Sequence, residues 1–199
     1  MSPTDSDSPV QDPFALFETV FQEAEPLGLE DPNAMVMSSV GDDGRPSSRV
    51  VLLKAFDSRG FVFYTNLESR KGREILAHPD VSLNFFWREL GKQIRVEGRA
   101  EQVADVEADA YFASRDHGSQ VGAWASRQSR PMKGRAELLG AVAQVKLRYP
   151  GKVPRPPHWS GFRVVPSRFE FWFKGIFRLH DRTVFERRDD GWHSYKIFP

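Results

Sequence analysis

Hydrophobic side chains near the start of the chain recur at helical spacing. Phe14 is followed by apolar residues at positions 16, 17, 20 and 21, intervals that place them on one face of an α-helix. We therefore predict an amphipathic helix over residues 14–26. The residues before it, 1–13, hold three prolines, three aspartates and four serines or threonines, a composition typical of a disordered leader. Residues 14–199 are predicted to form a single domain.

From Ala34 onward the pattern changes to short runs of β-branched and aromatic residues separated by turn residues. Such runs predict strands, and they lie at residues 34–40, 48–56, 61–65, 81–87, 92–103, 161–165, 169–175, 183–188 and 191–198. Helices are predicted over 69–78, 105–114 and 130–149, while the prolines of 153–157 exclude both helix and interior strand. Antiparallel strands with helices inserted late predict an α+β fold that is mainly β and barrel-like.

The overall composition excludes several classes of protein. Hydrophobic residues make up 40% of the chain and charged residues 28%, as in soluble globular proteins. The net charge of +1 provides no field that would recruit nucleic acid or an anionic membrane. No apolar run approaches the ~20 residues of a membrane helix, and residues 1–13 lack the features of a secretory signal. The chain has no cysteine, which excludes disulfides and thiolate metal sites and fits a cytoplasmic location.

A first cationic cluster lies at the start of the predicted helix 69–78. Ser69 is a candidate N-cap, but Arg70 and Lys71 follow it at the positive end of the helix dipole, where acidic residues are preferred. A bound phosphate would make this arrangement favourable, because the backbone N–H groups and both cations would converge on it. The alternative is a solvated basic start to the helix.

A second cluster comprises Arg178, His180 and Arg182. If this segment is a strand, residues two apart share a face, so the three side chains project together. They would repel one another unless an anion binds among them. The alternative is an exposed edge strand whose charges prevent aggregation.

Two further segments are candidate phosphate sites. The run from Arg49 to Lys54 is predicted to be a buried strand with a cation at each end, and Lys54 would need an acidic or phosphate partner. The alternative is that both charges simply emerge at the strand ends. Tyr111 and Arg115 lie one helical turn apart, with Ser119 beyond a predicted helix break at Gly118. They form a candidate phosphate cradle, or a helix with an ordinary exposed arginine.

Several catalytic motifs are absent from the sequence. The five histidines show no metal-ligand spacing, and neither G-x-G-x-x-G, nor a Walker A loop, nor G-x-S-x-G occurs. No pair of carboxylates is arranged as an acid and a base. Basic and aromatic groups without an acid/base set favour a site that holds a phosphorylated redox cofactor and relies on the chemistry of that cofactor.

In order and spacing, several motifs of this chain resemble those of the pyridoxamine/pyridoxine 5′-phosphate oxidase family. They are SRVVLLK, FVFYTNLESRKGREI, KQIRVEGRAE, YFASRDHGSQVGAWASRQS and FEFWFKGIFRLHDR, and the resemblance covers nearly all of residues 14–199. It implies an FMN-binding split β-barrel of six antiparallel strands. It also implies a homodimer with two flavin sites at the interface.

The same resemblance implies roles for individual residues. The implied FMN-binding positions are Arg49, Val50, Val51, Leu52, Lys54, Tyr64, Thr65, Arg70, Lys71, Gln93, Gln128, Ser129, Trp172 and Arg182, some of them from the partner subunit. The substrate phosphate would be bound by Lys54, Tyr111, Arg115 and Ser119. Arg178 and His180 would close over the pyridine ring of the substrate, next to the reacting carbon.

The implied activity is oxidation of pyridoxamine or pyridoxine 5′-phosphate to pyridoxal 5′-phosphate, with dioxygen as acceptor and hydrogen peroxide as by-product. One alternative is a phenazine-pathway flavin oxidase with a bulkier, unphosphorylated substrate. Another is a non-catalytic module that binds a flavin or a vitamer. The chain departs from the family at one point: no Arg or Lys precedes Arg45, whereas family members usually carry a basic segment that folds over the substrate.

Overall fold

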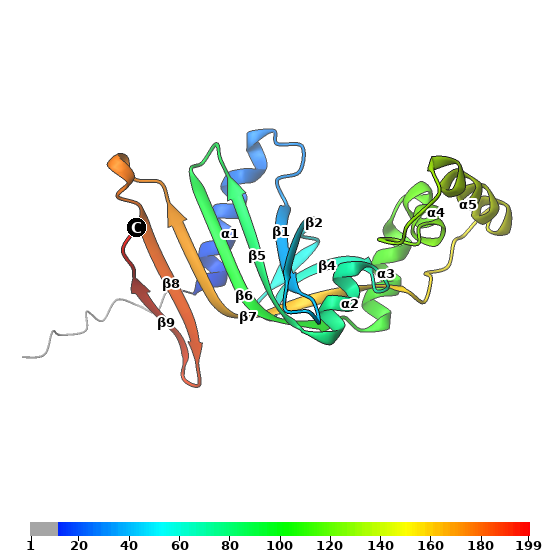
Figure 1. Ribbon diagram of the computed structural model, residues 1–199. Helices are drawn as coiled ribbons and strands as arrows, with labels where there is room; N and C mark the ends of the chain where they lie inside the picture. The colour runs from blue at the N-terminus through cyan, green and yellow to red at the C-terminus, as the bar shows by residue number, and fades with distance from the viewer. Residues whose placement is uncertain (1–11) are drawn as a thin grey trace, which may run out of the picture.

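One curled antiparallel sheet organises the computed structural model, which describes residues 12–199 (Figure 1). Its strands are β1 (Ala34–Val40), β2 (Pro46–Leu52), β3 (Ala55–Asp57), β4 (Gly60–Asn66), β5 (Asp80–Trp87), β6 (Lys92–Gln102), β7 (Trp159–Phe173), β8 (Asp181–Arg188) and β9 (Gly191–Lys196). The helices are α1 (Pro13–Ala24), α2 (Arg70–Ala77), α3 (Asp105–Ser114), α4 (His117–Ala125) and α5 (Arg135–Arg148), with the 3-10 turns η1 (Glu25–Leu27) and η2 (Ile176–Arg178). The predicted fold class, mainly β and antiparallel with flanking helices, is confirmed.

The first helix begins slightly before its predicted start. The Asp12 carboxylate accepts a hydrogen bond from the backbone N–H of Phe14 at 2.9 Å, and Pro13 occupies the first helical turn, where a missing N–H costs nothing. Pro13 therefore belongs to α1 and not to the predicted leader. Residues 1–11 of that leader lie outside the described residues.

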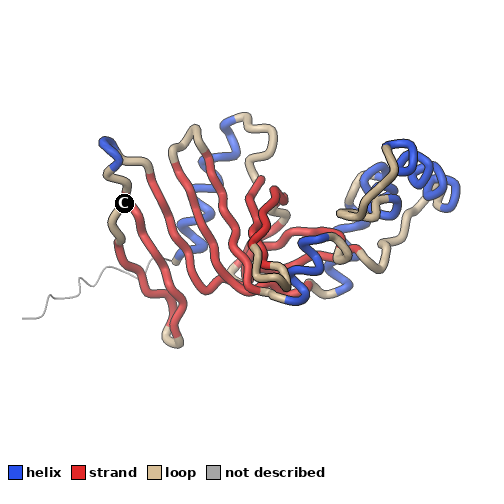
Figure 2. Tube along the Cα trace, viewed as in Figure 1, coloured by secondary structure: helices blue, strands red, loops and turns tan. Residues whose placement is uncertain are grey.

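Six strands lie side by side in the order β2-β1-β5-β6-β7-β4, each antiparallel to its neighbours. β3 adds to β4, and the β8–β9 hairpin adds to β7, so the sheet has nine strands where the family resemblance implies six. The first half of β7 pairs with β4 and its second half pairs with β8. Figure 2 shows the strands as one curved surface. The curvature brings the end of β2 towards β4.

Two predicted strands, 161–165 and 169–175, are a single strand in the structure, β7. Pro166 between them cannot donate a hydrogen bond to a neighbouring strand. β7 accommodates it at a β-bulge, where the pairing register shifts between Glu97 and Gly98 of β6. Gly98 permits the close approach, because a Cβ atom there would lie 2.2 Å from a carbonyl oxygen of β7.

The main core lies between α1 and the inner face of the sheet. Phe17 is fully buried and packs edge-on against Phe61 and Phe85, with ring centroids 4.8 and 5.0 Å away. Each such aromatic pair contributes about 0.5–1.5 kcal/mol beyond its buried area. Side chains along β5 alternate, so that Leu83 and Phe85 are buried while Asn84 between them points to the opposite face. The helix thus covers one face of the sheet.

α3, α4 and α5 form a helical arm (residues 105–148) at the end of the molecule opposite the β8–β9 hairpin (Figure 1). α3 coincides with its predicted range, whereas α5 is shorter than predicted and buries none of its residues. A small core of Phe112, Val121, Val153 and Trp159 joins the arm to β7. Among the helices of residues 12–199, none has the length and apolar character needed to cross a membrane.

Candidate active site

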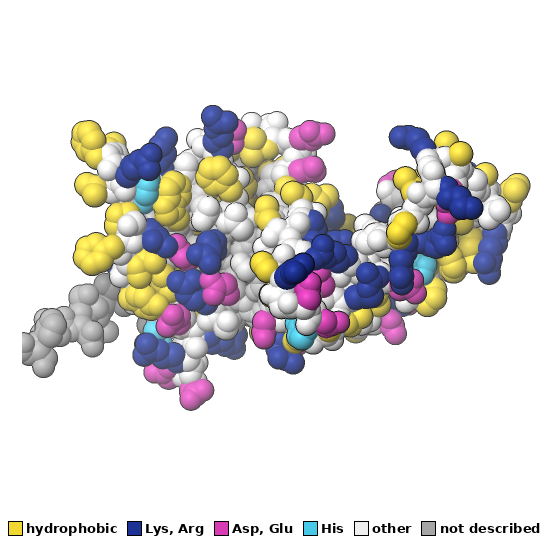
Figure 3. Space-filling model, viewed as in Figure 1, with side chains coloured by type: hydrophobic (Ala, Val, Ile, Leu, Met, Phe, Trp, Pro, Cys, Tyr) yellow, Lys and Arg dark blue, Asp and Glu magenta, His cyan; other side chains and the backbone are white. Residues whose placement is uncertain are grey.

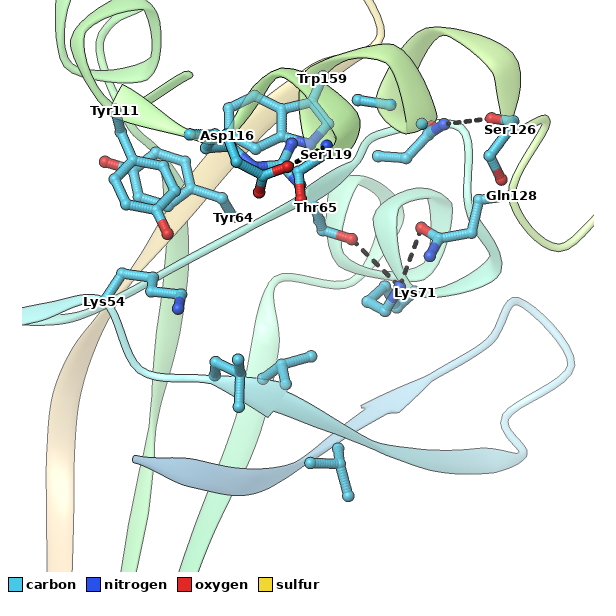
Figure 4. Close-up of a pocket in the computed structure, with 17 residues that line it drawn as sticks. Lys54, Tyr64, Thr65, Lys71, Tyr111, Asp116, Ser119, Ser126, Gln128 and Trp159 are labelled. Carbon is cyan, nitrogen blue, oxygen red and sulfur yellow. Dashed lines mark hydrogen bonds between the residues drawn. The ribbon is translucent and has the colours of Figure 1, made fainter. Parts of the chain in front are cut away.

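A cavity of about 690 Å³ opens where β2, β4 and the helical arm meet (Figure 4). In Figure 3, basic side chains gather on this face between α2 and the helical arm. Predicted site residues that line the cavity are Val50, Val51, Leu52, Lys54, Tyr64, Thr65, Lys71, Tyr111, Arg115, Ser119 and Gln128. Sequence reasoning missed Asn66, Asp116 and Trp159, which also line it.

Lys71 reaches the cavity from the first turn of α2. Ser69 is the N-cap, as predicted, because its hydroxyl accepts a hydrogen bond from the backbone N–H three residues on. Lys71 Nζ donates to Thr65 Oγ1 at 3.1 Å and to Gln128 Oε1 at 3.3 Å, both uncharged acceptors. Burial lowers the pKa of Lys71, and the nearby charge of Arg49 lowers it further. A bound anion would therefore stabilise the charged form of this side chain.

Arg49 and Arg70 point at a buried carboxylate, Glu74, and neither lines the cavity. Glu74 accepts from Arg70 Nε at 2.7 Å and from Arg49 Nη2 at 3.2 Å. The hydroxyls of Ser39 and Ser47 each donate to it at 2.6 Å. Sequence reasoning missed Glu74, although its position four residues after Arg70 is the spacing of a helical ion pair.

This cluster predicts an acid-sensitive contribution to stability. Burial alone would raise the pKa of Glu74, but hydrogen bonds from Ser39, Ser47 and Arg70 and the charge of Arg49 outweigh it and lower the pKa to about 2. Because the folded pKa lies below the ordinary value of 4.5, the stabilisation is complete above pH 4.5 and is lost as the pH falls towards 2.

We expect Glu74→Gln to reduce the free energy of unfolding at pH 7 by at most about 3 kcal/mol, and by much less at pH 3. Urea unfolding of both proteins at the two pH values measures the difference. An equal loss at pH 7 and pH 3 would show that the carboxylate charge does not stabilise the fold.

Arg115 lies at a break between two helices. α3 ends at Ser114, and the Asp116 carboxylate caps α4 by accepting from the backbone N–H of Ser119 at 2.8 Å. The predicted break at Gly118 is therefore wrong: the chain breaks at 115–116, because Asp116 is the better N-cap, and Gly118 and Ser119 lie in the first turn of α4. Tyr111, Arg115 and Ser119 nevertheless line one cavity, as the candidate phosphate cradle requires.

A group of parallel rings forms the wall behind Arg115. The Tyr64 ring lies 3.9 Å from Tyr111 and 5.4 Å from Trp159, with interplanar angles of 9° and 5°. The Arg115 guanidinium lies over the Trp159 ring, 4.9 Å from its centroid. Burial raises the pKa of Tyr64 to about 12, with a further contribution from the charge of Glu107. The Tyr64 phenol therefore stays protonated at neutral pH.

The segment from Arg49 to Lys54 is not a buried strand as predicted, and Lys54 lies between two strands. The predicted run 48–56 is split into β2 and β3, and Val50 is 64% exposed. β2 is the end strand of the sheet, with a neighbouring strand along one edge only, and Leu53 after it is buried in the core. Lys54 then extends into the cavity below Tyr64 and Tyr111 in the view of Figure 4.

A second group of predicted residues lies away from this cavity. Gln93, Trp172 and Arg182 form one row across β6, β7 and β8. Arg182 Nε donates to the buried carboxylate of Glu170 at 2.9 Å, and the ring of His180 lies 4.5 Å from that of Trp172. None of the row lines the cavity. A single chain therefore does not bring all the predicted site residues together.

The structure also changes the interpretation of residues 178–180 and of Ser129. Arg178 ends η2 with a φ of +65°, and β8 begins only at Asp181. Arg178, His180 and Arg182 are thus not successive positions on one strand face, because the chain turns through a left-handed conformation before β8. Ser129, with a φ of +69°, lies in the loop after α4 and lines a separate hollow beside Gln128.

The lining of the main cavity fits a ligand that is both flat and phosphorylated. Its cations are Lys54, Lys71 and Arg115, and within residues 12–199 none of the three forms an ion pair. Arg115 Nη1 is buried without a hydrogen-bond partner in the described part of the chain, an arrangement that costs free energy unless a ligand supplies the acceptor. FMN, which combines a planar ring system with a phosphate, matches both features.

Comparison with known proteins places the chain among flavin oxidases. Residues 21–149 match the family model described as pyridoxamine 5′-phosphate oxidase. Residues 159–199 match the model of the pyridoxine 5′-phosphate oxidase C-terminal dimerisation region. A pyridoxine/pyridoxamine 5′-phosphate oxidase of Myxococcus xanthus (strain DK1622) is 61% identical over 189 residues, which cover 94% of this chain and 92% of that protein.

Two solved structures share the architecture. PhzG from Burkholderia lata 383, in complex with tetrahydrophenazine-1-carboxylic acid, superposes with a TM-score of 0.90 at 33% identity, over 97% of this chain and 95% of the other. A pyridoxamine 5′-phosphate oxidase-related, FMN-binding protein from Nostoc punctiforme PCC 73102 superposes with a TM-score of 0.76 at 15% identity, over 98% and 100%, a likeness of fold alone. With two family models spanning most of its length, this chain belongs to the pyridoxamine 5′-phosphate oxidase family.

Proposed function

We propose that this protein is an FMN-dependent oxidase that converts pyridoxamine or pyridoxine 5′-phosphate to pyridoxal 5′-phosphate, with dioxygen as acceptor and hydrogen peroxide as by-product. One observation carries the proposal: Lys54, Lys71 and Arg115 line a single cavity without ion-pair partners within residues 12–199, in a chain of this family. Lys71 donates to the hydroxyl of Thr65, and the hydroxyl-bearing Tyr111 and Ser119 line the same cavity as Arg115, a combination suited to binding a phosphate. The absence of cysteine supports a cytoplasmic location.

The α2 side of the cavity is the proposed cofactor side. Lys71 and Thr65 would bind the FMN phosphate, and the backbone of residues 50–52 would run along the flavin. Arg49 and Arg70 would contribute positive potential from their positions around Glu74. When bound, FMN supplies the two-electron chemistry, for which the side chains of the cavity have no acceptor.

The α3–α4 side is the proposed substrate side. Tyr111, Arg115 and Ser119 would bind the substrate phosphate, and Lys54 would approach it from the end of β2. Fixing the phosphate orients the exocyclic carbon of the vitamer towards the flavin, and this orientation is the main contribution of the protein to the rate.

We further propose that the second group of residues (Gln93, Trp172, His180 and Arg182), together with Arg178, completes the site from another copy of the chain. Trp172, Arg178, His180 and Arg182 all lie within residues 159–199, which match the dimerisation region. Arg178 is exposed at the tip of the β7–β8 connection, where it can reach a neighbouring subunit. In a homodimer, each cavity would receive Arg178 and His180 from the partner.

A phenazine-type oxidase is the second candidate, since the PhzG structure carries tetrahydrophenazine-1-carboxylic acid and is 33% identical. The carboxylate of that ligand could also accept from Arg115 Nη1, so the unpaired donor alone does not separate the two substrates. The 61% identity to a pyridoxine/pyridoxamine 5′-phosphate oxidase, against 33% to PhzG, favours the phosphorylated vitamer. A non-catalytic flavin- or vitamer-binding module, the third candidate, would have no use for Arg178 and His180.

Purified protein with FMN and each vitamer tests the proposal. We expect a yellow dimer by absorbance and light scattering, and peroxide production from pyridoxamine and pyridoxine 5′-phosphate. Unphosphorylated pyridoxine should be a poor substrate, because it cannot engage Arg115. A colourless monomer that ignores added FMN contradicts the cofactor and the assembly. A wild type without preference for phosphorylated vitamers contradicts the substrate.

A further inference from the structure

Trp159 is a buried residue that the proposed function does not yet use. It begins β7, is 5% exposed, and lines the cavity with its indole ring (Figure 4). Its plane lies within 5° of the Tyr64 ring and within 4° of the Tyr111 ring. On the same indole lies the guanidinium of Arg115, 4.9 Å from the ring centroid. One side chain therefore contacts two groups proposed to bind the substrate phosphate.

Arg115 is oriented by aromatic rings. Besides Trp159, its guanidinium lies 5.8 Å from the ring centroid of Phe112, and no carboxylate within residues 12–199 forms an ion pair with it. Asp116, the adjacent acid, accepts the backbone N–H of Ser119. A carboxylate partner would occupy the N–H donors of Arg115, whereas a ring face attracts the cation and leaves those donors available to a ligand.

Trp159 is itself firmly held. Its backbone N–H donates to Pro156 O at 3.0 Å, and its carbonyl oxygen accepts from Arg155 Nη1 at 2.8 Å. Arg155 is paired with Asp105 and Asp109 of α3 at 2.7 and 2.5 Å. Through Arg155, the backbone of Trp159 is thus linked to α3, the helix that carries Tyr111.

We propose that Trp159 is a positioning residue for substrate recognition, which holds Arg115 and Tyr111 in the orientation that binds the substrate phosphate. In this way Trp159 sets the preference for phosphorylated over unphosphorylated substrate. The inference rests on the proposed function. It predicts that Trp159 affects only substrates that carry the phosphate.

The test compares Trp159→Leu, which removes the ring face, with Trp159→Phe, which keeps one. Peroxide production by the FMN-loaded enzyme is measured with pyridoxine 5′-phosphate and with unphosphorylated pyridoxine. We expect Trp159→Leu to raise the KM for the phosphorylated vitamer about 5- to 30-fold, the range of a desolvated cation–π contact, with kcat and the kcat/KM for pyridoxine within about twofold of wild type. Trp159→Phe should have a KM for the phosphorylated vitamer close to that of wild type, because it keeps a ring face.

Trp124→Leu is the matched control. Trp124 is an indole of the same small cluster, lies under Arg148, and does not line the cavity. Trp124→Leu should leave the ratio of the KM for pyridoxine 5′-phosphate to the KM for pyridoxine unchanged. If Trp159→Leu does not fold, Trp159→Met fills the space with a flexible apolar chain that has no ring face, and the same KM shift is expected.

A double mutant decides whether Trp159 acts through Arg115. In an Arg115→Ala background, Trp159→Leu should change the KM for the phosphorylated vitamer less than about twofold, because its main target is gone and only its effect on Tyr111 remains. Additive effects, or an equal loss with both substrates, would overturn the inference. If wild type does not discriminate between the two substrates, the proposed function fails as well. If wild type discriminates and Arg115→Ala abolishes this, but Trp159→Leu has no effect, only the inference fails.

Discussion

We expect Arg115→Ala to raise the KM for pyridoxamine 5′-phosphate roughly 30- to 1,000-fold. This change corresponds to about 2–4 kcal/mol of binding free energy, the cost of removing one partner of a desolvated charge pair. Arg115 would bind the phosphate equally in the ground state and the transition state, so kcat should fall much less than kcat/KM. Steady-state peroxide production measures both parameters. A phenazine-type oxidase would not turn over pyridoxamine 5′-phosphate even as wild type.

His180→Ala is the informative comparison, because His180 belongs to the second group of residues. If His180 lies next to the reacting carbon of the substrate, as proposed, its loss should reduce kcat while FMN binding survives. Co-expression of the two mutant chains then tests the shared site. If Arg115 and His180 of one site come from different subunits, about half of the dimers are mixed and each has one intact site, restoring about a quarter of wild-type activity. No recovery would place both residues in the same subunit's site.

Lys71→Ala should weaken FMN binding by ~1.5–3 kcal/mol, about 10- to 150-fold, the scale of a charge-assisted hydrogen bond. Stability of the apo protein should be unchanged or slightly higher, because burial already disfavours the Lys71 charge and a cation leaves a helix N-terminus. Titration of the apo protein with FMN, followed by flavin fluorescence, gives the affinity. Thermal unfolding without FMN gives the stability.

Arg70→Ala is the control one residue away on the same helix turn. Its guanidinium is paired with Glu74 and does not line the cavity, so we expect a smaller loss of FMN affinity than for Lys71→Ala. Equal losses would show that both cations contact the phosphate when FMN is bound. Unchanged FMN affinity in both variants would show that the basic residues at the start of α2 do not bind the cofactor.

The sequence alone determined the fold class and several elements around the cavity, but it did not predict α4 (His117–Ala125). Alternation of apolar residues predicted β5 and β6, and the Ser69 cap with Pro79 after it predicted α2, because these signals depend only on neighbours along the chain. Sequence also identified Lys71, Tyr111, Arg115 and Ser119, since adjacent cations and hydroxyls are visible without a structure.

Partners distant in sequence were decided by the tertiary structure. In the sequence, Arg49, Arg70 and Lys71 are equivalent candidates for binding a phosphate. In the structure, Glu74 forms ion pairs with both arginines, whereas Lys71 lines the cavity. β2 reads as a buried strand, yet it is the end strand of the sheet and Val50 is exposed. Local pattern does not reveal which strand is last in a sheet.

Other features arise only where separate elements meet. The platform of Tyr64, Tyr111 and Trp159 joins β4, α3 and β7, and no motif links the three positions. The separation of Gln93, Trp172 and Arg182 from the cavity follows from strand order. Sequence specifies which groups a chain can offer to a ligand, through residue type and local spacing. The three-dimensional packing of elements far apart in sequence decides which charges are already paired and which remain for the ligand.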